Sequence, residues 1–431
     1  MAKETINVPA LARVEGEGGL YIGVKNGEVE EIKVNIYEPP RFFEGFLRGR
    51  FLQDVPDITA RICGICPVAY QFSSIRALEK ALGITVPHVV TDLRKLLYYG
   101  EWIESHEIHS YKLQGPDLTG HESAISLAAD APEVVASALR AKKAGNDIME
   151  VIGGRSVHPV NACVGGWYRW PDKAALKALL PELRWGLEFA KETVRWANTL
   201  PYPELRVDDY EFVALHHEDE YAILEGDIIS SKYGVLVEED YEKYYAEKHV
   251  EHSNALHSQS KDGTPYMVGP MARLNLNYDQ LGETAKASAE EIGLTLPITN
   301  PYRQLIARAV ETVEAFEKAI ELIESYDPSG PSFQPLKLKK GSGMAASEAP
   351  RGTLFHRYTI DDQGLVEFAR IVPPTAQNLA RMEADLWLMA PQVLEMPHDE
   401  ATLTCEHLLR AYDPCISCAT HFLTLTVEER D

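Results

Sequence analysis

Two pairs of cysteines, each of the form C-x-x-C, are the residues of this sequence best suited to chemistry. One pair lies in RICGICP at 61–67 and the other in DPCISCATH at 413–421. Such a pair lets two thiolates bind one ion from a single turn of chain, and thiolates favour zinc, copper(I) and iron–sulfur chemistry. The sequence therefore offers four candidate ligands of one metal centre: Cys63, Cys66, Cys415 and Cys418.

Spacing alone leaves other interpretations of these cysteines open. Pairs of structural zinc ligands usually lie roughly 15–20 residues apart, whereas these two pairs lie near opposite ends of the chain. A dithiol redox motif is a second alternative, although the chain lacks the βαβ order of a thioredoxin. Burial of free cysteines is a third. The choice between zinc and a softer redox metal also stays open.

Local patterns indicate which element positions the first pair. Pro67 follows Cys66 and opens a run of helical periodicity that ends at Gly83. We therefore expect a helix with Cys66 at its N-terminal edge. The positive end of a helix dipole lowers the pKa of a nearby thiol, so this cysteine is suited to act as a thiolate.

The remaining pattern predicts a mainly α (α+β) fold with a helical core and small peripheral β-hairpins. We expect one interwoven domain over 1–431, with a peripheral, loop-rich excursion at 205–270. Alternation around tight turns predicts hairpins at 19–37 and 353–371. Apolar stripes of period 3.6 predict helices at 88–113, 131–151, 173–199, 302–327, 374–390 and 399–411.

The composition excludes several classes of protein. Lys and Arg number 42 against 65 Asp and Glu, a formal net charge of −23. This disfavours a nucleic-acid partner, because binding phosphates needs a basic face. No apolar run approaches the ~20 residues of a membrane helix, and the N-terminus lacks the apolar region of a signal peptide. We therefore expect a cytoplasmic protein that does not bind membranes.

Acidic, imidazole and guanidinium groups flank the cysteines in numbers that a structural zinc site does not need. Glu15 lies in RVEGEG, Glu44 in FEGFLRGR and Arg351 in EAPRGTLFH, while Asp413 and His421 flank the second pair. With these motifs the chain resembles the large, catalytic subunit of NiFe-hydrogenases over nearly its whole length. RICGICPVAYQ is most similar to the soluble, bidirectional NAD(P)-linked group, which includes the sulfhydrogenases. Further matching stretches are HEIHSYKLQGPD, GGRSVHP, VGPMARLN, NPYRQLIARAVE and PTAQN.

The resemblance implies reversible conversion of H₂ to two protons and two electrons at a centre of nickel and iron. The iron would carry one CO and two cyanide ligands. Cys63 and Cys415 would bind nickel alone, and Cys66 and Cys418 would bridge nickel and iron. The resemblance also places Asp117 and Asp413 near Arg351 above the metals, with an ordinary buried salt bridge as the alternative. Residues expected around the diatomic ligands are Pro350, Arg351, Leu354, Pro374 and Thr375.

Two further roles follow from the resemblance. Glu15 would pass protons from the Cys415 sulfur. Glu44 and His421, with the backbone carbonyl of Ile371, would hold magnesium, an ion that prefers oxygen ligands.

Partner proteins are implied because this chain lacks a third cysteine cluster and a G-x-G-x-x-G motif. The resemblance places Fe–S clusters on a small subunit, with flavin and NAD(P) on diaphorase-type subunits. A hydrogen-sensing regulatory hydrogenase, a hydrogenase-like part of complex I and a zinc-stapled protein are the rival functions. Two positions depart from the family pattern, since Tyr70 and Glu17 stand where it often has histidine.

The last ten residues, 422–431, allow two interpretations. In many relatives a maturation protease cuts just after the position of His421, which would make these residues a removable extension. The alternating stretch FLTLTVE instead favours a retained strand.

Overall fold

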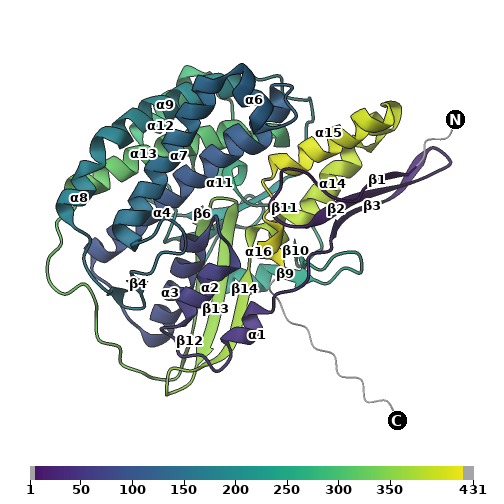
Figure 1. The fold of residues 1–431 in the computed structure, drawn as a ribbon. Helices are drawn as coiled ribbons and strands as arrows, with labels where there is room; N and C mark the ends of the chain where they lie inside the picture. Colours follow the sequence, from purple (N-terminus) through teal and green to yellow (C-terminus); the bar gives the residue numbers. More distant parts are fainter. Residues whose placement is uncertain (1–4, 421–431) are drawn as a thin grey trace, which may run out of the picture.

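Long helices form the largest layer of the molecule (Figure 1). The structure is a computed structural model that describes residues 5–420. Helices α4 (His88–Ile108), α7 (Pro132–Gly153), α9 (Leu180–Asn198) and α13 (Gln304–Ser325) pack against one another. The apolar stripe of α13 is buried as predicted. The mainly helical fold is therefore confirmed.

Two of the predicted helices are less regular than their apolar stripes suggested. The helix expected at 173–199 consists of α8 (Lys173–Ala178) and α9, because Pro181 in the first turn of α9 cannot continue the hydrogen bonds of α8. The helix expected at 88–113 is α4 followed by a π-helical turn, His109–Leu113.

The helix predicted after Cys66 is α3 (Pro67–Leu82), and Gly83 ends it with a φ of 67°, a left-handed conformation that glycine adopts readily. The two predicted C-terminal helices are α14 (Pro374–Glu395) and α15 (His398–Ala411). The shorter helices are α1 (Phe43–Leu47), α2 (Val55–Thr59), α5 (Gln114–Leu118), α6 (Ala124–Asp130), α10 (Tyr241–Tyr244), α11 (Pro270–Asn277), α12 (Glu283–Glu291) and α16 (Ile416–Ala419).

Both predicted hairpins are confirmed, and each gains a third strand. In the first sheet β1 (Ile6–Val8) pairs with β2 (Gly18–Lys25), which turns at Asn26-Gly27 into β3 (Glu28–Ile36). In the second, β13 (Gly352–Ile360) and β14 (Val366–Val372) are joined by β12 (Gly341–Ala349). The sequence did not indicate β12, because GSGMAASEA has small residues and no β-branched or aromatic ones.

The segment at 205–270, expected to be a loop-rich excursion, also contains strands that the sequence did not indicate. This segment contains the four-stranded sheet β11-β6-β7-β8 and the pair β9-β10, and Tyr241 stacks on Phe355 of β13 at 4.5 Å. Its strands are short and irregularly spaced, so no period was visible in the sequence. Their bounds are β6 (Glu211–His216), β7 (Asp227–Ser230), β8 (Gly234–Leu236), β9 (Tyr245–Lys248), β10 (His257–Ser260) and β11 (Tyr266–Met267).

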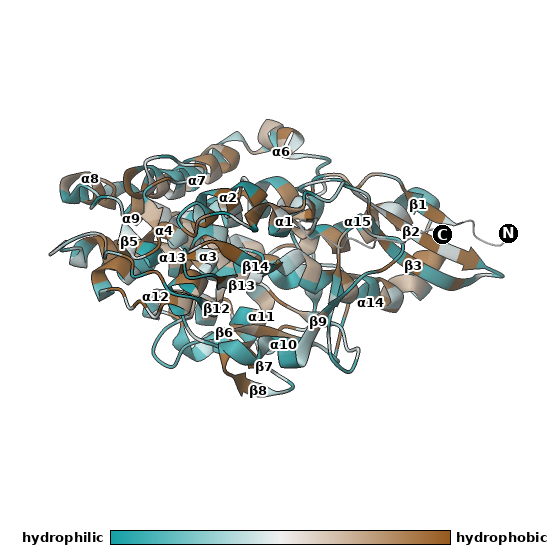
Figure 2. Cartoon of the chain, turned by 90° about the horizontal axis from the view of Figure 1, so that it is seen from below, coloured by the Kyte–Doolittle hydropathy of each residue, from teal (hydrophilic) through white to brown (hydrophobic). Residues whose placement is uncertain are grey.

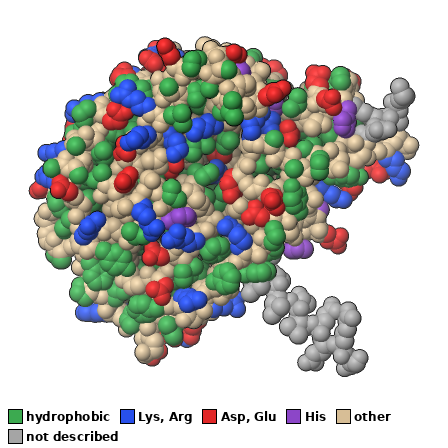
Figure 3. Space-filling model, viewed as in Figure 1, with side chains coloured by type: hydrophobic (Ala, Val, Ile, Leu, Met, Phe, Trp, Pro, Cys, Tyr) green, Lys and Arg blue, Asp and Glu red, His purple; other side chains and the backbone are tan. Residues whose placement is uncertain are grey.

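The elements lie in distinct parts of the molecule. Figure 2 shows α8 and α9 at one end, the β1–β3 sheet with α14 and α15 at the other, and β6–β8 along one side. The small hairpin β4 (Ala162–Cys163) and β5 (Gly166–Trp167) completes the strands of the described residues. Acidic and basic side chains are interspersed over the face in Figure 3. Within residues 5–420, no helix is long and apolar enough to cross a membrane.

Candidate metal centre

The structure brings the four predicted cysteine ligands together at one buried point. Cys66 caps the N-terminus of α3, and Cys415 and Cys418 lie at the N-terminus and within α16. The sulfurs of Cys63 and Cys415 are 3.7 Å apart and those of Cys66 and Cys418 are 3.8 Å apart. All four sulfurs lie within 4.8 Å of one another, a separation that suits shared metal ligands.

Backbone donors and a buried carboxylate hold the first cysteine pair in place. The N–H groups of Ile65 and Cys66 point at Cys63 Sγ from 3.3 and 3.1 Å. Glu101 of α4 accepts hydrogen bonds from the N–H groups of Val68 and Ala69, at 2.6 and 3.2 Å. Because these N–H groups begin α3, the carboxylate fixes the helix end that carries Cys66.

The pKa values of the four cysteine thiols shift in different directions. Burial raises the pKa of Cys66, Cys415 and Cys418. The pKa of Cys63 is instead lowered, because contacts with the other three thiols, together with the charge of Arg351, outweigh its burial. Four adjacent sulfurs can all become thiolates only if cations compensate their charge. The donor set thus fits a centre of soft metal cations.

Arg351 and Asp413, which the resemblance predicts to act above the metals, are called the catalytic pair below. Arg351 lies close enough to the sulfurs of Cys415 and Cys66 to interact with their charge. Arg351 Nε donates to the Asp413 carbonyl at 2.8 Å, and Nη2 lies 3.1 Å from Asp413 Oδ1. Asp413 has a φ of 53°, a conformation that non-glycine residues seldom adopt. Within the described chain, Arg351 Nη1 and Asp413 Oδ2 are buried without a hydrogen-bond partner.

Charges of both signs surround the catalytic pair. Burial disfavours the cation of Arg351, yet Asp413 and the sulfurs of Cys415 and Cys66 raise its pKa above the ordinary value. Burial likewise opposes the Asp413 anion, but Arg351, His109 and Arg308 lower its pKa. Burial lowers the pKa of Arg308 to about 10. Sequence reasoning gave Arg308 no role, although its motif NPYRQLIARAVE was recognised.

Asp117, expected near Arg351, makes its described ion pairs with other residues. Asp117 Oδ2 is 2.7 Å from Arg410 Nε, and its Oδ1 contacts Arg13 and lies 3.2 Å from His407 Nε2. These ion pairs are what we expected if Asp117 forms an ordinary buried salt bridge. A single acid, Asp413, pairs with Arg351 among the described residues.

The residues expected around the diatomic ligands are buried near the second cysteine pair or on the strand beside it. Thr375 Oγ1 accepts a hydrogen bond from the Cys415 N–H at 2.9 Å. Leu354 is fully buried on β13. Pro350 and Pro374 are also buried, one before Arg351 and the other at the start of α14.

Glu15 contacts the second cysteine pair directly. Its Oε2 lies 3.0 Å from Cys415 Sγ and accepts the Ser417 N–H at 3.1 Å. Its carbonyl accepts the Ile416 N–H at 2.9 Å. Backbone and side-chain contacts together hold this carboxylate against the sulfur.

The structure also brings together the two described residues of the expected magnesium site. Glu44 Oε1 accepts the Ile371 N–H at 2.8 Å. His421, the third expected ligand, and the possible strand at 422–431 lie outside the described residues.

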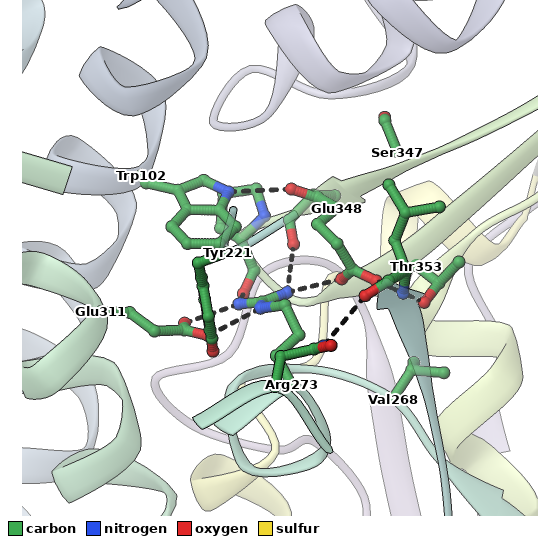
Figure 4. Close-up of polar contacts among 12 residues, drawn as sticks. Trp102, Tyr221, Val268, Arg273, Glu311, Ser347, Glu348 and Thr353 are labelled. Atoms are coloured by element: carbon green, nitrogen blue, oxygen red, sulfur yellow. Dashed lines mark hydrogen bonds and ion pairs between the residues drawn. The ribbon is translucent and has the colours of Figure 1, made fainter. Parts of the chain in front are cut away.

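A second buried charge assembly, the scaffold cluster, consists of Arg273, Glu311 and Glu348. Figure 4 shows the Arg273 guanidinium between the two carboxylates. Its Nε and Nη2 each lie 2.7 Å from Glu311, and its Nη1 lies 2.8 Å from Glu348. The same guanidinium donates to the carbonyls of Ala349 and Pro350, at 2.9 and 3.0 Å. It therefore fixes the two residues that precede Arg351. These residues lie in the motifs VGPMARLN, NPYRQLIARAVE and EAPRGTLFH, but the motifs did not indicate that the three side chains meet.

Histidines of the motifs HEIHSYKLQGPD and GGRSVHP contact other parts of the chain. His106 Nε2 lies 3.0 Å from Glu311, His109 Nε2 is 2.8 Å from the Arg410 carbonyl, and His158 Nδ1 is 2.9 Å from the Ala60 carbonyl. Tyr70 is buried, and its hydroxyl makes no hydrogen bond within the described chain. Burial and the neighbouring thiols, that of Cys418 first, raise its pKa.

Comparison with known proteins gives matches over nearly the whole chain. The nickel-dependent hydrogenase family profile matches residues 41–137 and 236–421. The alpha chain of sulfhydrogenase 1 from Pyrococcus furiosus is 36% identical, over 97% of this chain and 98% of the relative. The corresponding chain of the F420-non-reducing hydrogenase from Methanothermobacter thermautotrophicus is 29% identical, over 96% and 94%.

Solved structures share the fold. A crystal structure of an NAD⁺-reducing [NiFe]-hydrogenase in the H₂-reduced state superposes with a TM-score of 0.88 and 26% identity, covering 98% of this chain and 100% of that one. A reduced Ni-Fe-Se hydrogenase from Desulfomicrobium baculatum gives 0.75 at 20% identity, covering 97% and 100%, a likeness of fold alone.

Proposed function

The chain belongs to the nickel-dependent hydrogenase family, and from that premise we propose that its four cysteines hold a nickel–iron centre that interconverts H₂ with protons and electrons. The observation that carries this proposal is the buried set of four sulfurs, all within 4.8 Å of one another. In the proposed assignment, Cys63 and Cys415 would hold nickel, and Cys66 and Cys418 would hold both nickel and iron. The iron would carry one CO and two cyanides. When bound, this centre supplies the site that binds and polarises H₂.

The chain's own residues shape the space beside the sulfurs. The unpaired Nη1 of Arg351 and the unpaired Oδ2 of Asp413 are a buried donor and acceptor without partners among residues 5–420. They are placed to orient a small molecule or a metal-bound diatomic ligand by hydrogen bonds. Thr375 contributes a hydroxyl, and Pro350, Leu354 and Pro374 contribute apolar walls that exclude water.

Glu15 is the proposed proton acceptor at Cys415. A carboxylate 3.0 Å from a thiol sulfur is within reach of direct proton transfer. Its bond to the Ser417 N–H keeps Oε2 at that sulfur. The proton would leave the buried site through this side chain.

We propose two further features that rest on the resemblance. Glu44 and the Ile371 carbonyl, with His421, hold a magnesium ion, and their closeness supports this assignment. Electrons pass to the Fe–S clusters of a small subunit, then by way of flavin to NAD(P) on diaphorase-type subunits. The likeness to an NAD⁺-reducing hydrogenase supports the nicotinamide partner. We place the enzyme in the cytoplasm.

Isotope exchange between H₂ and D₂O tests the proposed activity without depending on a partner's electron acceptor. Protein matured with nickel should catalyse the exchange, and protein produced without nickel should not. Nickel-loaded protein that exchanges no faster than the nickel-free preparation would overturn the proposal. Reduction of NAD⁺ or NADP⁺ by H₂ in the complete complex tests the nicotinamide assignment separately.

A further inference from the structure

A second group of side chains with the chemistry of metal ligands lies on β10, on the loop before it and on α14, away from the cysteine segments. His252 lies in the loop after β9, His257 begins β10, and Glu383 lies on α14. Each offers one ligand atom, and these atoms lie within 4.8 Å of one another. Two imidazoles and a carboxylate are a common ligand set of zinc and other first-row divalent ions.

One imidazole–carboxylate distance in this group is a hydrogen bond, and the other suits a shared ion. His252 Nε2 lies 2.8 Å from Glu383 Oε1, and His257 Nδ1 lies 3.7 Å from Glu383 Oε2. The second distance is too long for a hydrogen bond. It is close to the roughly 3.4 Å between two ligands of a tetrahedral ion with bonds of about 2.0–2.1 Å. Each carboxylate oxygen thus faces a different imidazole.

His257 lacks the partners that a buried imidazole normally has. It is 3% exposed, and in the described part of the chain its Nε2 has no hydrogen-bond partner. Buried polar atoms are nearly always paired with protein, water or an ion. The carboxylate, in contrast, is oriented, because the Val34 N–H of β3 donates to Glu383 Oε1 at 2.9 Å. Backbone bonds of this kind hold metal-ligating carboxylates in position.

We propose that His252, His257 and Glu383 form a second divalent metal site, for Zn²⁺ or a similar first-row transition ion. The side chains of His252 and Glu383 are 22% and 17% exposed, which gives an ion a way in and leaves a position for water. The ion ties β10 and the loop before it to α14. Since α14 begins at Pro374 and Thr375, the site fastens the helix whose first turn contacts Cys415.

Zinc content in purified, nickel-loaded protein tests the site. His252→Gln removes one ligand at a partly exposed position, and His249→Gln, at an exposed histidine three residues away, is the matched control. After incubation with Zn²⁺ and removal of free metal, wild type and His249→Gln should hold one zinc per chain more than His252→Gln. Equal zinc in wild type and His252→Gln would overturn the proposal.

Two further measurements on the same samples distinguish zinc at this site from zinc at the four cysteines, whose thiolates are also suited to zinc. Nickel content and H₂/D₂O exchange should be equal in all three proteins, so that a zinc difference reports on the histidines. Glu383→Gln keeps the side-chain shape and removes its charge. It should lose the extra zinc and the rise in melting temperature that Zn²⁺ gives the wild type, and retention of both would also contradict the proposal.

Discussion

The catalytic pair and the scaffold cluster are both buried guanidinium–carboxylate assemblies, but they differ in how completely they are satisfied. Arg273 in the scaffold cluster makes five hydrogen bonds, to Glu311, Glu348 and two backbone carbonyls. Arg351 keeps one nitrogen, and Asp413 one oxygen, without a partner among residues 5–420. An unsatisfied buried group costs about 1–3 kcal/mol. A ligand that completes these bonds would remove that cost, in agreement with the role proposed for Arg351 and Asp413.

Replacing a cysteine ligand should have the largest effect, because it removes a ligand of the proposed metal centre beside Arg351 and Asp413. Cys→Ser at position 63, 66, 415 or 418 should abolish H₂ oxidation and lower the nickel content. Cys163→Ser and Cys405→Ser are the matched controls, since both residues are buried away from the four sulfurs, and these variants should stay active. Full activity of Cys63→Ser would show that the sulfurs do not act together.

Arg351→Lys tests whether the catalytic pair needs the guanidinium of Arg351 or only its charge. Lysine keeps the positive charge but loses the planar fork that reaches Asp413 and presents Nη1. H₂ oxidation should fall by orders of magnitude while nickel and iron stay bound. A loss of about tenfold or less, about 1.4 kcal/mol in the barrier, would mean that Arg351 is mainly structural.

Glu15→Gln tests proton transfer with little change of shape. Glutamine can still accept the Ser417 N–H, but it cannot carry a proton. Exchange between H₂ and D₂O should collapse while the metal content stays at the wild-type value. Normal exchange in this variant would place the proton exit elsewhere.

Arg273→Met breaks the scaffold cluster and should act first on stability. Two carboxylates would be left buried without their cation, and breaking such a pair costs about 3–5 kcal/mol. The melting temperature of the nickel-loaded protein should fall well below that of Arg351→Lys. Similar melting temperatures for these two variants would show that the scaffold cluster contributes no more to stability than the catalytic pair does.

Glu107 gives the smallest predicted effect, a change in the pH dependence of stability. Burial raises its pKa to about 8, and its Oε2 has no partner in the described chain. The folded protein therefore keeps a proton that the unfolded chain releases near its ordinary pKa of 4.5. Stability from this group falls as pH rises between these values. Melting temperatures across this range should fall less in Glu107→Gln, and an unchanged slope would contradict the assignment.

Local signals in the sequence predicted much of the fold. Asn26-Gly27 gave the turn of the first hairpin, and Pro67 and Gly83 gave the ends of α3. The strands within 205–270 and β12 were missed, because their order depends on packing against β13 and not on a local period.

The candidate site was predicted less evenly. Spacing and family resemblance brought the four cysteines, Glu15 and Arg351 together. The scaffold cluster was missed because its charged residues look like surface residues until their long-range partners are known. The resemblance predicts Asp117 near Arg351, and the sequence did not indicate its ion pairs with Arg410 and Arg13.

Metal analysis combined with infrared spectroscopy of the purified, nickel-loaded protein tests the central claim most directly. We expect one nickel and one iron per chain, with infrared bands of one CO and two cyanide ligands. The iron and these bands should disappear in Cys66→Ser and persist in Arg351→Lys. Zinc alone at the four cysteines of protein matured with nickel, without CO and cyanide bands, would contradict it.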